Sequence, residues 1–414
     1  MEFPESNLNT LNKTEYDVVV IGGGMVGASL ALGFGKQGKS VLLVEHLKPE
    51  ASWLAKPPLR VSAINRFSEN WLQDIGCWSQ IESKAMCQFT RLATWEQGAP
   101  RVEFSASDIN ESHLGFLVRN EAIQLAAYEA IKQSQFNIEV VFGCHLGQIK
   151  SLPTNQTQVQ LLNSEVEQDI VCCLLVGADG ANSKVRQLSD IGTSGWDYQQ
   201  QCFSITINTQ FEQQDITWQQ FQPSGPKAFL PLNNNYACLI WYDSKEKVEE
   251  LKALDFVSLK KQIVATFPKL PGDFDIEQTA SFPLTRRQAN RYFNNRVVLV
   301  GDAAHTINPL AGQGVNLGFK DNAELLSLLS SLDLSNDSLL NNGKSGKSQL
   351  DIALTKYNLK RKADSLLMSS VMDTFYHLFS NEKTIHKSAR SILLNTANLF
   401  PQAKVAVMKK ALGF

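Results

Sequence analysis

The sequence lacks a strong excess of charge of either sign. Its 414 residues carry 39 Lys and Arg against 41 Asp and Glu, which gives a formal net charge of -2 and a pI near 6.3. Proteins that bind nucleic acid usually present a clustered basic face to the phosphates. Because this composition gives no such footprint, we expect no nucleic-acid partner.

The sequence also lacks a long apolar run. Its longest candidates, 17–21 with the following glycines and 171–178, are far shorter than the roughly 20 residues that cross a bilayer as a helix. Residues 1–15 are mostly polar and have neither the basic start nor the apolar middle of a secretory signal, so we expect a flexible tail. These absences predict a cytoplasmic protein that is soluble or peripheral to the inner membrane.

Cysteines at metal or redox spacing are absent as well. The seven cysteines form no C-x-x-C pair, and no histidine lies at zinc spacing from them. An odd number of scattered cysteines is typical of buried thiols in a reducing compartment. We therefore expect free, buried cysteines and no metal site.

A glycine-rich motif follows the first apolar strand. Gly22, Gly24 and Gly27 form G-x-G-x-x-G, an apolar helix follows, and Glu45 closes the next strand. The first glycine permits a tight turn, the second lets the backbone approach a pyrophosphate, and the third lets the helix pack on the strand. With a strand before it, a helix after it and an acid about 20 residues on, this motif predicts a dinucleotide site with Glu45 on a ribose.

Two more strand ends carry glycines and an acid. The apolar run 169–176 leads to Asp179-Gly180, and the run 297–300 leads to Gly301-Asp302 and then to Gly312-Gln313-Gly314. A helix that begins at these last glycines offers free N–H groups and partial positive charge to a planar anionic ligand. Each junction alone could be a capped turn. Three of them in one chain favour a shared ligand.

In order and spacing, the three junctions resemble the motifs of single-component flavin-dependent aromatic hydroxylases. From about residue 16 to 414 the chain is most similar to ubiquinone-biosynthesis hydroxylases, in particular to demethoxyubiquinol hydroxylases. The segments that carry this further resemblance are 60–64 (Arg-Val-Ser-Ala-Ile), 217–221 (Thr-Trp-Gln-Gln-Phe), 225–232 (Gly-Pro-Lys-Ala-Phe-Leu-Pro-Leu), 282–287 (Phe-Pro-Leu-Thr-Arg-Arg) and 411–414 (Ala-Leu-Gly-Phe).

The resemblance implies an α/β fold with an α+β insert. It combines a Rossmann-like FAD-binding domain of the para-hydroxybenzoate hydroxylase type with an antiparallel-sheet substrate domain and C-terminal helices. The expected division is a tail (1–15), an FAD-binding domain (16–75, 115–192 and 285–330), a substrate domain (76–114 and 193–284) and a helical region (350–414).

The resemblance also implies FAD as cofactor and assigns residues to it. Asp302 would reach the ribityl chain and pyrophosphate, Arg60 would lie near the flavin, and Asp179 with Arg186 would brace the site. Arg119 is a further expected flavin contact, although ubiquinone-type members commonly have an acid at that place. The expected cofactor-binding residues are Gly22, Gly24, Gly27, Glu45, Arg60, Arg119, Asp179, Asp302, Gly314, Val315 and Asn316. From composition alone, Arg60 would be an ordinary surface cation.

The implied reaction hydroxylates the aromatic ring of a prenylated benzoquinol. NADPH or NADH reduces FAD, the reduced flavin reacts with O2 to form a flavin hydroperoxide, and the distal oxygen transfers to the ring. The N–H groups at 312–314 would stabilise charge on the flavin, and Pro309 would wall the oxygen site. His305 is a candidate base. Two points argue against this role: a quinol is already activated, and His305 follows a structural turn. The expected catalytic residues are Pro309, Gly312, Gln313, Gly314 and His305.

Other features leave alternatives open. Aromatic residues of the inserted sheet could pave an apolar pocket or lie in its core: Trp218, Phe221, Phe229, Trp241 and Phe282. Residues 360–362 (Lys-Arg-Lys) are predicted to form a solvated face. The amphipathic segment 387–414 predicts either peripheral membrane contact or docking on the body. Alternative functions are a flavin reductase or oxidase, hydroxylation of another ring position or phenol, and a non-catalytic scaffold in a multi-enzyme ubiquinone-biosynthesis complex. A homo-oligomer is also possible.

Overall fold

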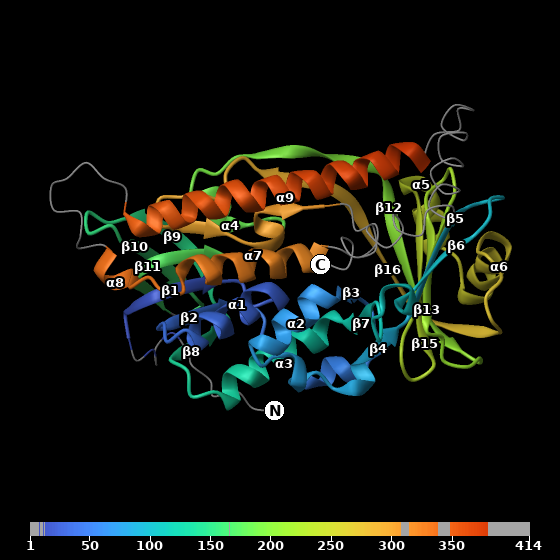
Figure 1. The fold of residues 1–414 in the computed structure, drawn as a ribbon, viewed down its shortest axis with the longest axis horizontal. Coiled ribbons are helices and arrows are strands. Elements are labelled where there is room, and N and C mark those ends of the chain that lie inside the picture. Colours follow the sequence, from blue (N-terminus) through green and yellow to red (C-terminus); the bar gives the residue numbers. More distant parts are fainter. Residues whose placement is uncertain are drawn as a thin grey trace.

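The computed structural model describes residues 8, 11, 13–164, 166–307, 314–337 and 348–379. Within them the chain forms three β-sheets with helices packed around them. Figure 1 shows the first sheet with most of the helices at the left and the second sheet at the right. The predicted α/β class with an antiparallel insert is confirmed.

The first sheet is mostly parallel and contains the apolar runs of the sequence. Its strands lie in the order β17-β18-β11-β1-β2-β8, with β10 and β9 branching from β11. Their bounds are β1 (Glu15–Ile21), β2 (Val41–Glu45), β8 (Ile138–Phe142), β9 (His145–Ser151), β10 (Thr157–Leu162), β11 (Glu167–Gly177), β17 (Phe293–Asn294) and β18 (Val297–Leu299). As predicted for the run 169–176, β11 is central, and it pairs in parallel with both β1 and β18.

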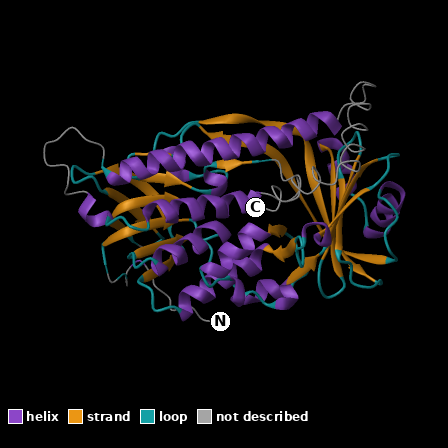
Figure 2. Ribbon diagram, in the orientation of Figure 1, coloured by secondary structure: helices purple, strands orange, loops and turns teal. Residues whose placement is uncertain are grey.

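Helices cover this sheet at close range. They are α1 (Met25–Lys36), α2 (Arg66–Asp74), α3 (Asn120–Gln133), α4 (Lys184–Leu188), α7 (Gly314–Leu329), α8 (Leu334–Asp337) and α9 (Gln349–Phe379). A Cβ on Gly33 of α1 would lie 2.4 Å from the side chain of Leu326, so this glycine lets α1 and α7 approach closely. Figure 2 shows the long helix α9 running along the first sheet and ending near the second sheet.

The second sheet is antiparallel except where β13 pairs with β5. Its order is β19-β16-β12-β15-β14-β13-β5-β6. The strands are β5 (Arg91–Glu96), β6 (Val102–Ser105), β12 (Thr193–Thr209), β13 (Ile216–Phe221), β14 (Lys227–Pro231), β15 (Tyr236–Ser244), β16 (Phe274–Ala289) and β19 (His305–Thr306). The alternating polar and apolar residues of 204–209 predict a short strand, which is wrong in length, because β12 extends from Thr193 to Thr209. The polar residues before Cys202 continue β12 as its exposed end.

Two helices cover the outer face of the second sheet, α5 (Lys245–Lys252) and α6 (Phe256–Thr266). A third, small antiparallel sheet is formed by β3 (Val61–Asn65), β7 (Gly115–Arg119) and β4 (Met86–Phe89). The segment from Pro57 to Arg60, which leads into β3, lies against the second sheet: Gln278 donates to the Pro57 carbonyl oxygen at 2.7 Å. The face of the second sheet opposite α5 and α6 is therefore turned toward the nucleotide-binding part.

All seven cysteines are free and buried, as the sequence predicted. In the described part of the chain, no helix is both long and apolar enough to cross a membrane. The segment 387–414, for which membrane contact or docking was predicted, lies outside the described residues.

Candidate functional site

The three predicted junctions meet at one edge of the first sheet. Strands β1, β11 and β18 are neighbours, and their last residues are in register, with Ile21 opposite Gly177 and Gly177 opposite Leu299. Backbone hydrogen bonds continue past the strands, from the Ala178 amide to Ile21 and from the Val300 amide to Gly177. The carboxyl ends of parallel strands, where the connections diverge, are where α/β proteins bind nucleotides.

In the glycine turn after β1, two glycines pack against neighbouring backbone and the third faces open space. A Cβ on Gly22, whose φ is +99°, would meet the Ala178 carbonyl oxygen at 2.5 Å, and one on Gly27 would meet the Gly22 carbonyl oxygen at 1.8 Å. A Cβ on Gly24 would meet no atom within 4 Å. Two of the glycines thus let the backbone pack on itself, whereas Gly24 faces space in which a ligand can approach the backbone.

Glu45 ends β2 and fixes the same turn. Its Oε2 accepts a hydrogen bond of 2.6 Å from the Gly23 amide, and its Oε1 accepts one of 3.0 Å from the Leu47 amide. Gln124 of α3 donates to the Gly23 carbonyl oxygen at 2.9 Å. Bonds from amides to a carboxylate are among the strong ones. The predicted ribose contact of Glu45 stays a prediction, and the carboxylate already orders the turn beside it.

Asp179 and Arg186 connect the second junction to the third. Asp179 Oδ2 accepts from the amides of Lys184 and Val185 at 2.7 and 3.0 Å and so caps α4. Its buried Oδ1 accepts no hydrogen bond within the described residues. The Arg186 guanidinium donates to the carbonyl oxygens of Ala181 and Ala303, each at 2.8 Å. Arg186 therefore ties α4 to the Gly301–Asp302 turn, and its role in bracing the cofactor site stays a prediction.

Asp302 follows Gly301 in the third junction. Solvent reaches its side chain, yet so many protein atoms surround it that desolvation raises the pKa of its carboxyl, a shift opposed by His305 and Arg60. The carboxylate is therefore accessible to a ligand, although protein atoms crowd around it. An acid in this setting can accept hydrogen bonds from the hydroxyl groups of a bound ligand.

The chain is similar to known proteins over most of its length. A family model described as the FAD binding domain matches residues 15–342. The chain belongs to this FAD-binding family. It is 37% identical to 3-demethoxyubiquinol 3-hydroxylase from Escherichia coli, over 96% of this chain and 98% of that relative. It is 28% identical to the mitochondrial ubiquinone biosynthesis monooxygenase COQ6 of Xenopus tropicalis, over 97% and 94% of the two chains.

A solved structure shows the same fold. The p-nitrophenol 4-monooxygenase PnpA from Pseudomonas putida aligns with a TM-score of 0.76 at 18% identity, over 97% of each chain. With the family and the relatives, this makes the chain a flavin-dependent monooxygenase with FAD as cofactor and O2 as co-substrate. The site fits FAD, because the open side of Gly24 admits a pyrophosphate and Asp302 is accessible for hydroxyl groups.

The remaining predicted cofactor residues lie around this edge. Arg60 is exposed, and its guanidinium lies 5.4 Å from the centroid of the Phe282 ring. Asn316 is buried and bonds to β3 through the Ala63 carbonyl oxygen and the Asn65 amide. Gly314 begins α7, and a Cβ there would meet no atom within 4 Å. Val315 follows it, half-buried against the core. These four assignments stay predictions.

The side chain of Arg119 forms hydrogen bonds within the protein in this structure. Its guanidinium donates to the carbonyl oxygens of Trp53 and Leu54 at 3.0 and 2.9 Å and so holds the loop after β2. It also lines a cavity of about 180 Å³ together with Lys56 and Asn233. A flavin contact of Arg119 stays a prediction. The predicted catalytic residues Pro309, Gly312 and Gln313 lie outside the described residues.

The predicted substrate pocket needs a correction. Trp218, Phe229 and Trp241 point to the outer face of the second sheet, where they are at most 6% exposed and pack against α5 and α6. Trp218 and Phe229 face each other on paired strands and stack at 5.7 Å. These three aromatics are core residues, because the side chains of a strand alternate between faces and theirs fall on the helix-covered side.

Phe282 lies on the opposite, inner face. It packs near Cys202, Tyr242 and Leu284, all buried, and under Arg60. Phe221 is half-buried, and its odd position in β13 places it on the face opposite Trp218. Of the five predicted pocket residues, Phe282 and Phe221 are therefore the two on the side of the nucleotide-binding part.

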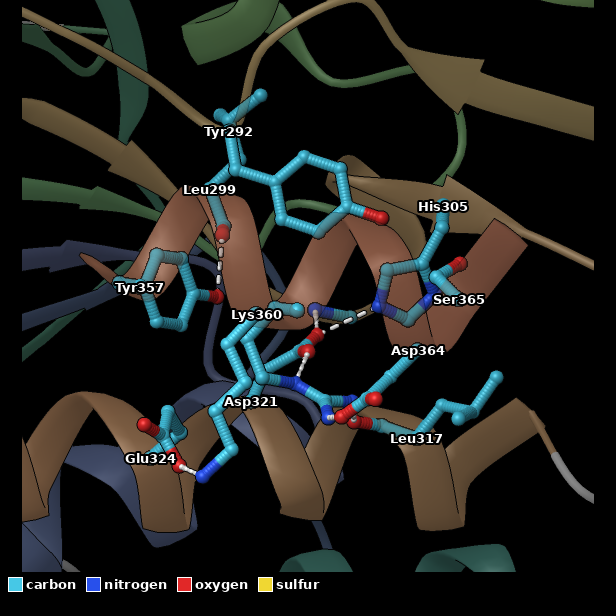
Figure 3. Close-up of polar contacts among 12 residues, drawn as sticks. Tyr292, Leu299, His305, Leu317, Asp321, Glu324, Tyr357, Lys360, Asp364 and Ser365 are labelled. Carbon is cyan, nitrogen blue, oxygen red and sulfur yellow. Dashed lines mark hydrogen bonds and ion pairs between the residues drawn. The ribbon is translucent and has the colours of Figure 1, made fainter. Parts of the chain in front are cut away.

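The sequence analysis missed a buried charged group between α7 and α9. Figure 3 shows Asp321 of α7 facing His305. Arg361 of α9 donates from its Nε to Asp321 Oδ1 at 2.7 Å. Arg361 is 2% exposed, so the prediction of a solvated face at 360–362 is wrong for this residue. The spacing of the buried positions in α9 was the available signal: they include Leu350, Leu354, Tyr357, Arg361 and Ser365, three or four residues apart.

Proposed function

We propose that the chain hydroxylates the aromatic ring of a prenylated benzoquinol intermediate of ubiquinone biosynthesis, with NADPH or NADH as electron donor. The observation that carries this proposal is the 37% identity, over nearly the whole chain, to an enzyme named 3-demethoxyubiquinol 3-hydroxylase. FAD supplies the oxygen chemistry when it is bound, and the protein supplies position, charge and exclusion of water.

The inner face of the second sheet supports an aromatic substrate. Phe282, Ile240 and Tyr198 are half-buried there, beside the buried Cys202 and Tyr242. A half-buried apolar wall is a surface on which a ring and an apolar tail can lose contact with water. We place the quinol ring against Phe282, between this wall and Asp302.

Arg60 provides a cation at the same place. Its guanidinium lies over the Phe282 ring, and its charge opposes the rise in the pKa of Asp302. Arg60 therefore lies close both to the apolar wall and to the turn at residues 301–304, which we call the cofactor turn. A guanidinium is a good donor to an oxygen that gains negative charge. We assign Arg60 to orient a quinol hydroxyl and to stabilise charge on it.

The deciding experiment supplies isotopically labelled dioxygen (¹⁸O₂) to the FAD-loaded protein with a demethoxylated prenyl quinol and NADPH. We expect one labelled oxygen atom in the product by mass spectrometry. Consumption of NADPH with unlabelled or unchanged quinol would instead indicate a flavin reductase or oxidase. Purified protein that stays colourless when FAD is added would favour a scaffold. Fragment masses of the product would distinguish the ring positions.

We also propose that the chain works at the surface of the inner membrane, because a prenylated substrate resides in the bilayer. The basic and apolar positions of 387–414 make this segment the candidate for peripheral contact. Association with other enzymes of the pathway, or with a second copy of the chain, belongs to the same proposal. Sedimentation with liposomes, with and without residues 387–414, tests the membrane contact.

A further inference from the structure

The Asp321 carboxylate is fully buried and accepts hydrogen bonds from three different parts of the chain. Its Oδ2 accepts from the Gly301 amide at 2.9 Å and from His305 Nε2 at 2.6 Å, and its Oδ1 accepts from Arg361 Nε at 2.7 Å. Figure 3 shows the carboxylate between the histidine ring and α9. A buried carboxylate is stable only with such partners.

These partners lie at both ends of the cofactor turn. Gly301 follows β18, which belongs to the first sheet, and His305 begins β19, which belongs to the second. The connection between β18 and β19, residues 300–304, contains Asp302 and changes direction at Gly301, whose φ is +58°. Asp321 therefore bonds to the first-sheet end and the second-sheet end of the turn that joins β18 to β19.

The charge of Asp321 is held by its surroundings. Burial alone would raise the pKa of its carboxyl, but His305 and Arg361 outweigh this effect and lower it. Arg361 also donates to Asp364 and to the Leu317 carbonyl oxygen, so its guanidinium is fixed in place. Nearby, Tyr357 of α9 donates to the Leu299 carbonyl oxygen at 2.9 Å. Helix α9 thus supports β18 and the turn after it.

Only part of this arrangement is needed for packing. An apolar pair at 321 and 361 would fill the same space, and such replacements of buried ion pairs are often neutral or stabilising. An apolar side chain could not accept the Gly301 amide or the His305 ring, which orient the backbone on either side of Asp302. The three simultaneous bonds therefore indicate a requirement for the geometry of the turn.

We propose that Asp321, held by Arg361, is the positioning residue that sets the direction of Asp302 toward FAD and keeps the cofactor turn in register with the substrate sheet through His305. The role is positional, because Asp321 is fully buried and is placed to act through Gly301 and His305. The proposal rests on FAD binding, which the family shows, and does not depend on the identity of the substrate.

The test uses a double variant that removes the acceptor oxygens of Asp321 and both charges together, Asp321→Leu with Arg361→Met. Loss of Arg361 alone would leave a buried unpaired carboxylate and risk unfolding. We expect the full-length double variant to keep the melting temperature of the apoprotein within a few degrees of wild type. Its dissociation constant for FAD, measured by flavin fluorescence, should rise about tenfold, with a changed absorption spectrum of the bound flavin.

The chain offers a matched control in α2. There Arg66 pairs with Glu69 at 2.6 Å, and Glu69 in turn contacts His113 at 2.8 Å, which repeats the combination of arginine, acid and histidine away from the turn. The variant Glu69→Leu with Arg66→Met should leave the FAD dissociation constant unchanged. Equal weakening in both double variants would indicate a general loss of order and would overturn the proposal, as would wild-type FAD affinity in the first.

Variants of His305 test the hydrogen bond between Asp321 and the end of the cofactor turn that enters the second sheet. A glutamine can place an amide nitrogen close to Nε2, whereas a phenylalanine cannot donate to Asp321. We expect His305→Gln to restore the wild-type flavin spectrum and FAD affinity, and His305→Phe to weaken FAD binding. If the two variants behave alike, the bond to Asp321 has no positioning role. Both readouts stand even if the labelled-oxygen experiment gives no hydroxylated quinol.

Discussion

A methyl group on Gly27 would lie 1.8 Å from the carbonyl oxygen of Gly22, whereas one on Gly24 would meet nothing within 4 Å. The two positions therefore separate folding from cofactor binding. We expect Gly27→Ala to destabilise the apoprotein by several kcal/mol, because backbone must move to relieve the overlap. We expect Gly24→Ala, at a backbone φ of -67°, to fold normally and to bind FAD at least about tenfold more weakly. Thermal unfolding and flavin fluorescence measure the two effects. Normal FAD binding by Gly24→Ala would place the pyrophosphate elsewhere.

Trp241 and Phe282 lie on opposite faces of the second sheet and should respond differently to truncation. Trp241→Ala is expected to cost about 3–5 kcal/mol of unfolding free energy with little change in KM, because it opens a cavity under α5 and α6. Phe282→Ala is expected to raise KM for the quinol and the fraction of NADPH consumed without hydroxylation, at small cost in stability. Denaturant unfolding and steady-state kinetics decide. If Trp241→Ala folds but has a raised KM for the quinol, the substrate binds on the outer face of the second sheet instead.

Asp302→Asn should stabilise the apoprotein and weaken FAD binding. Desolvation raises the pKa of Asp302 in the folded state, so the ionised carboxylate opposes folding at neutral pH, and the wild type regains this stability as pH falls through the folded-state pKa. We expect a melting temperature slightly above wild type at pH 7, with the difference shrinking in acid; the rise is small because solvent reaches the side chain. The FAD dissociation constant should rise about tenfold through the lost charged acceptor. A lower melting temperature at pH 7 would contradict this assignment.

Because Lys227 is buried, we expect the unfolding free energy to increase at alkaline pH. Burial lowers the pKa of its ammonium group to about 8, although Asp243 opposes the shift. The unfolded chain holds this proton up to a higher pH, so the unfolding free energy should increase between pH 8 and 10, by up to about 3 kcal/mol. Denaturant unfolding of wild type and Lys227→Met at several pH values measures the difference. Parallel pH profiles would show that Lys227 keeps an ordinary pKa.

Local patterns predicted the nucleotide-binding part well. The glycines at 22, 24 and 27 and the apolar run of β11 each carry a spacing or periodicity that belongs to one element. The apolar residues of 121–133 recur at helical spacing, which predicts the helix observed as α3. The resemblance supplied the ligand that connects the three junctions, and the family bears it out. Element boundaries were less accurate where a strand becomes polar, as at the exposed start of β12.

The residues that the sequence misplaced depend on faces and on distant partners. Trp218 and Phe282 are both aromatic residues in strands, and only the placement of α5 and α6 decides which of them is core. Arg361 lies in a basic run, and its burial depends on Asp321, 40 residues away. Composition favours exposure for a lone arginine. Such a charge becomes predictable only when its partner is known.

The burial of all seven cysteines has a consequence for how long the protein stays intact. Hydrogen peroxide oxidises the thiolate form of cysteine. Burial raises the pKa of Cys77 to about 12 and that of Cys87, Cys144 and Cys238 to about 11, which keeps these thiols protonated as well as shielded. Peroxide released by a failed turnover would therefore find few cysteine thiolates to attack, so that thiol oxidation by its own by-product should contribute little to the protein's inactivation.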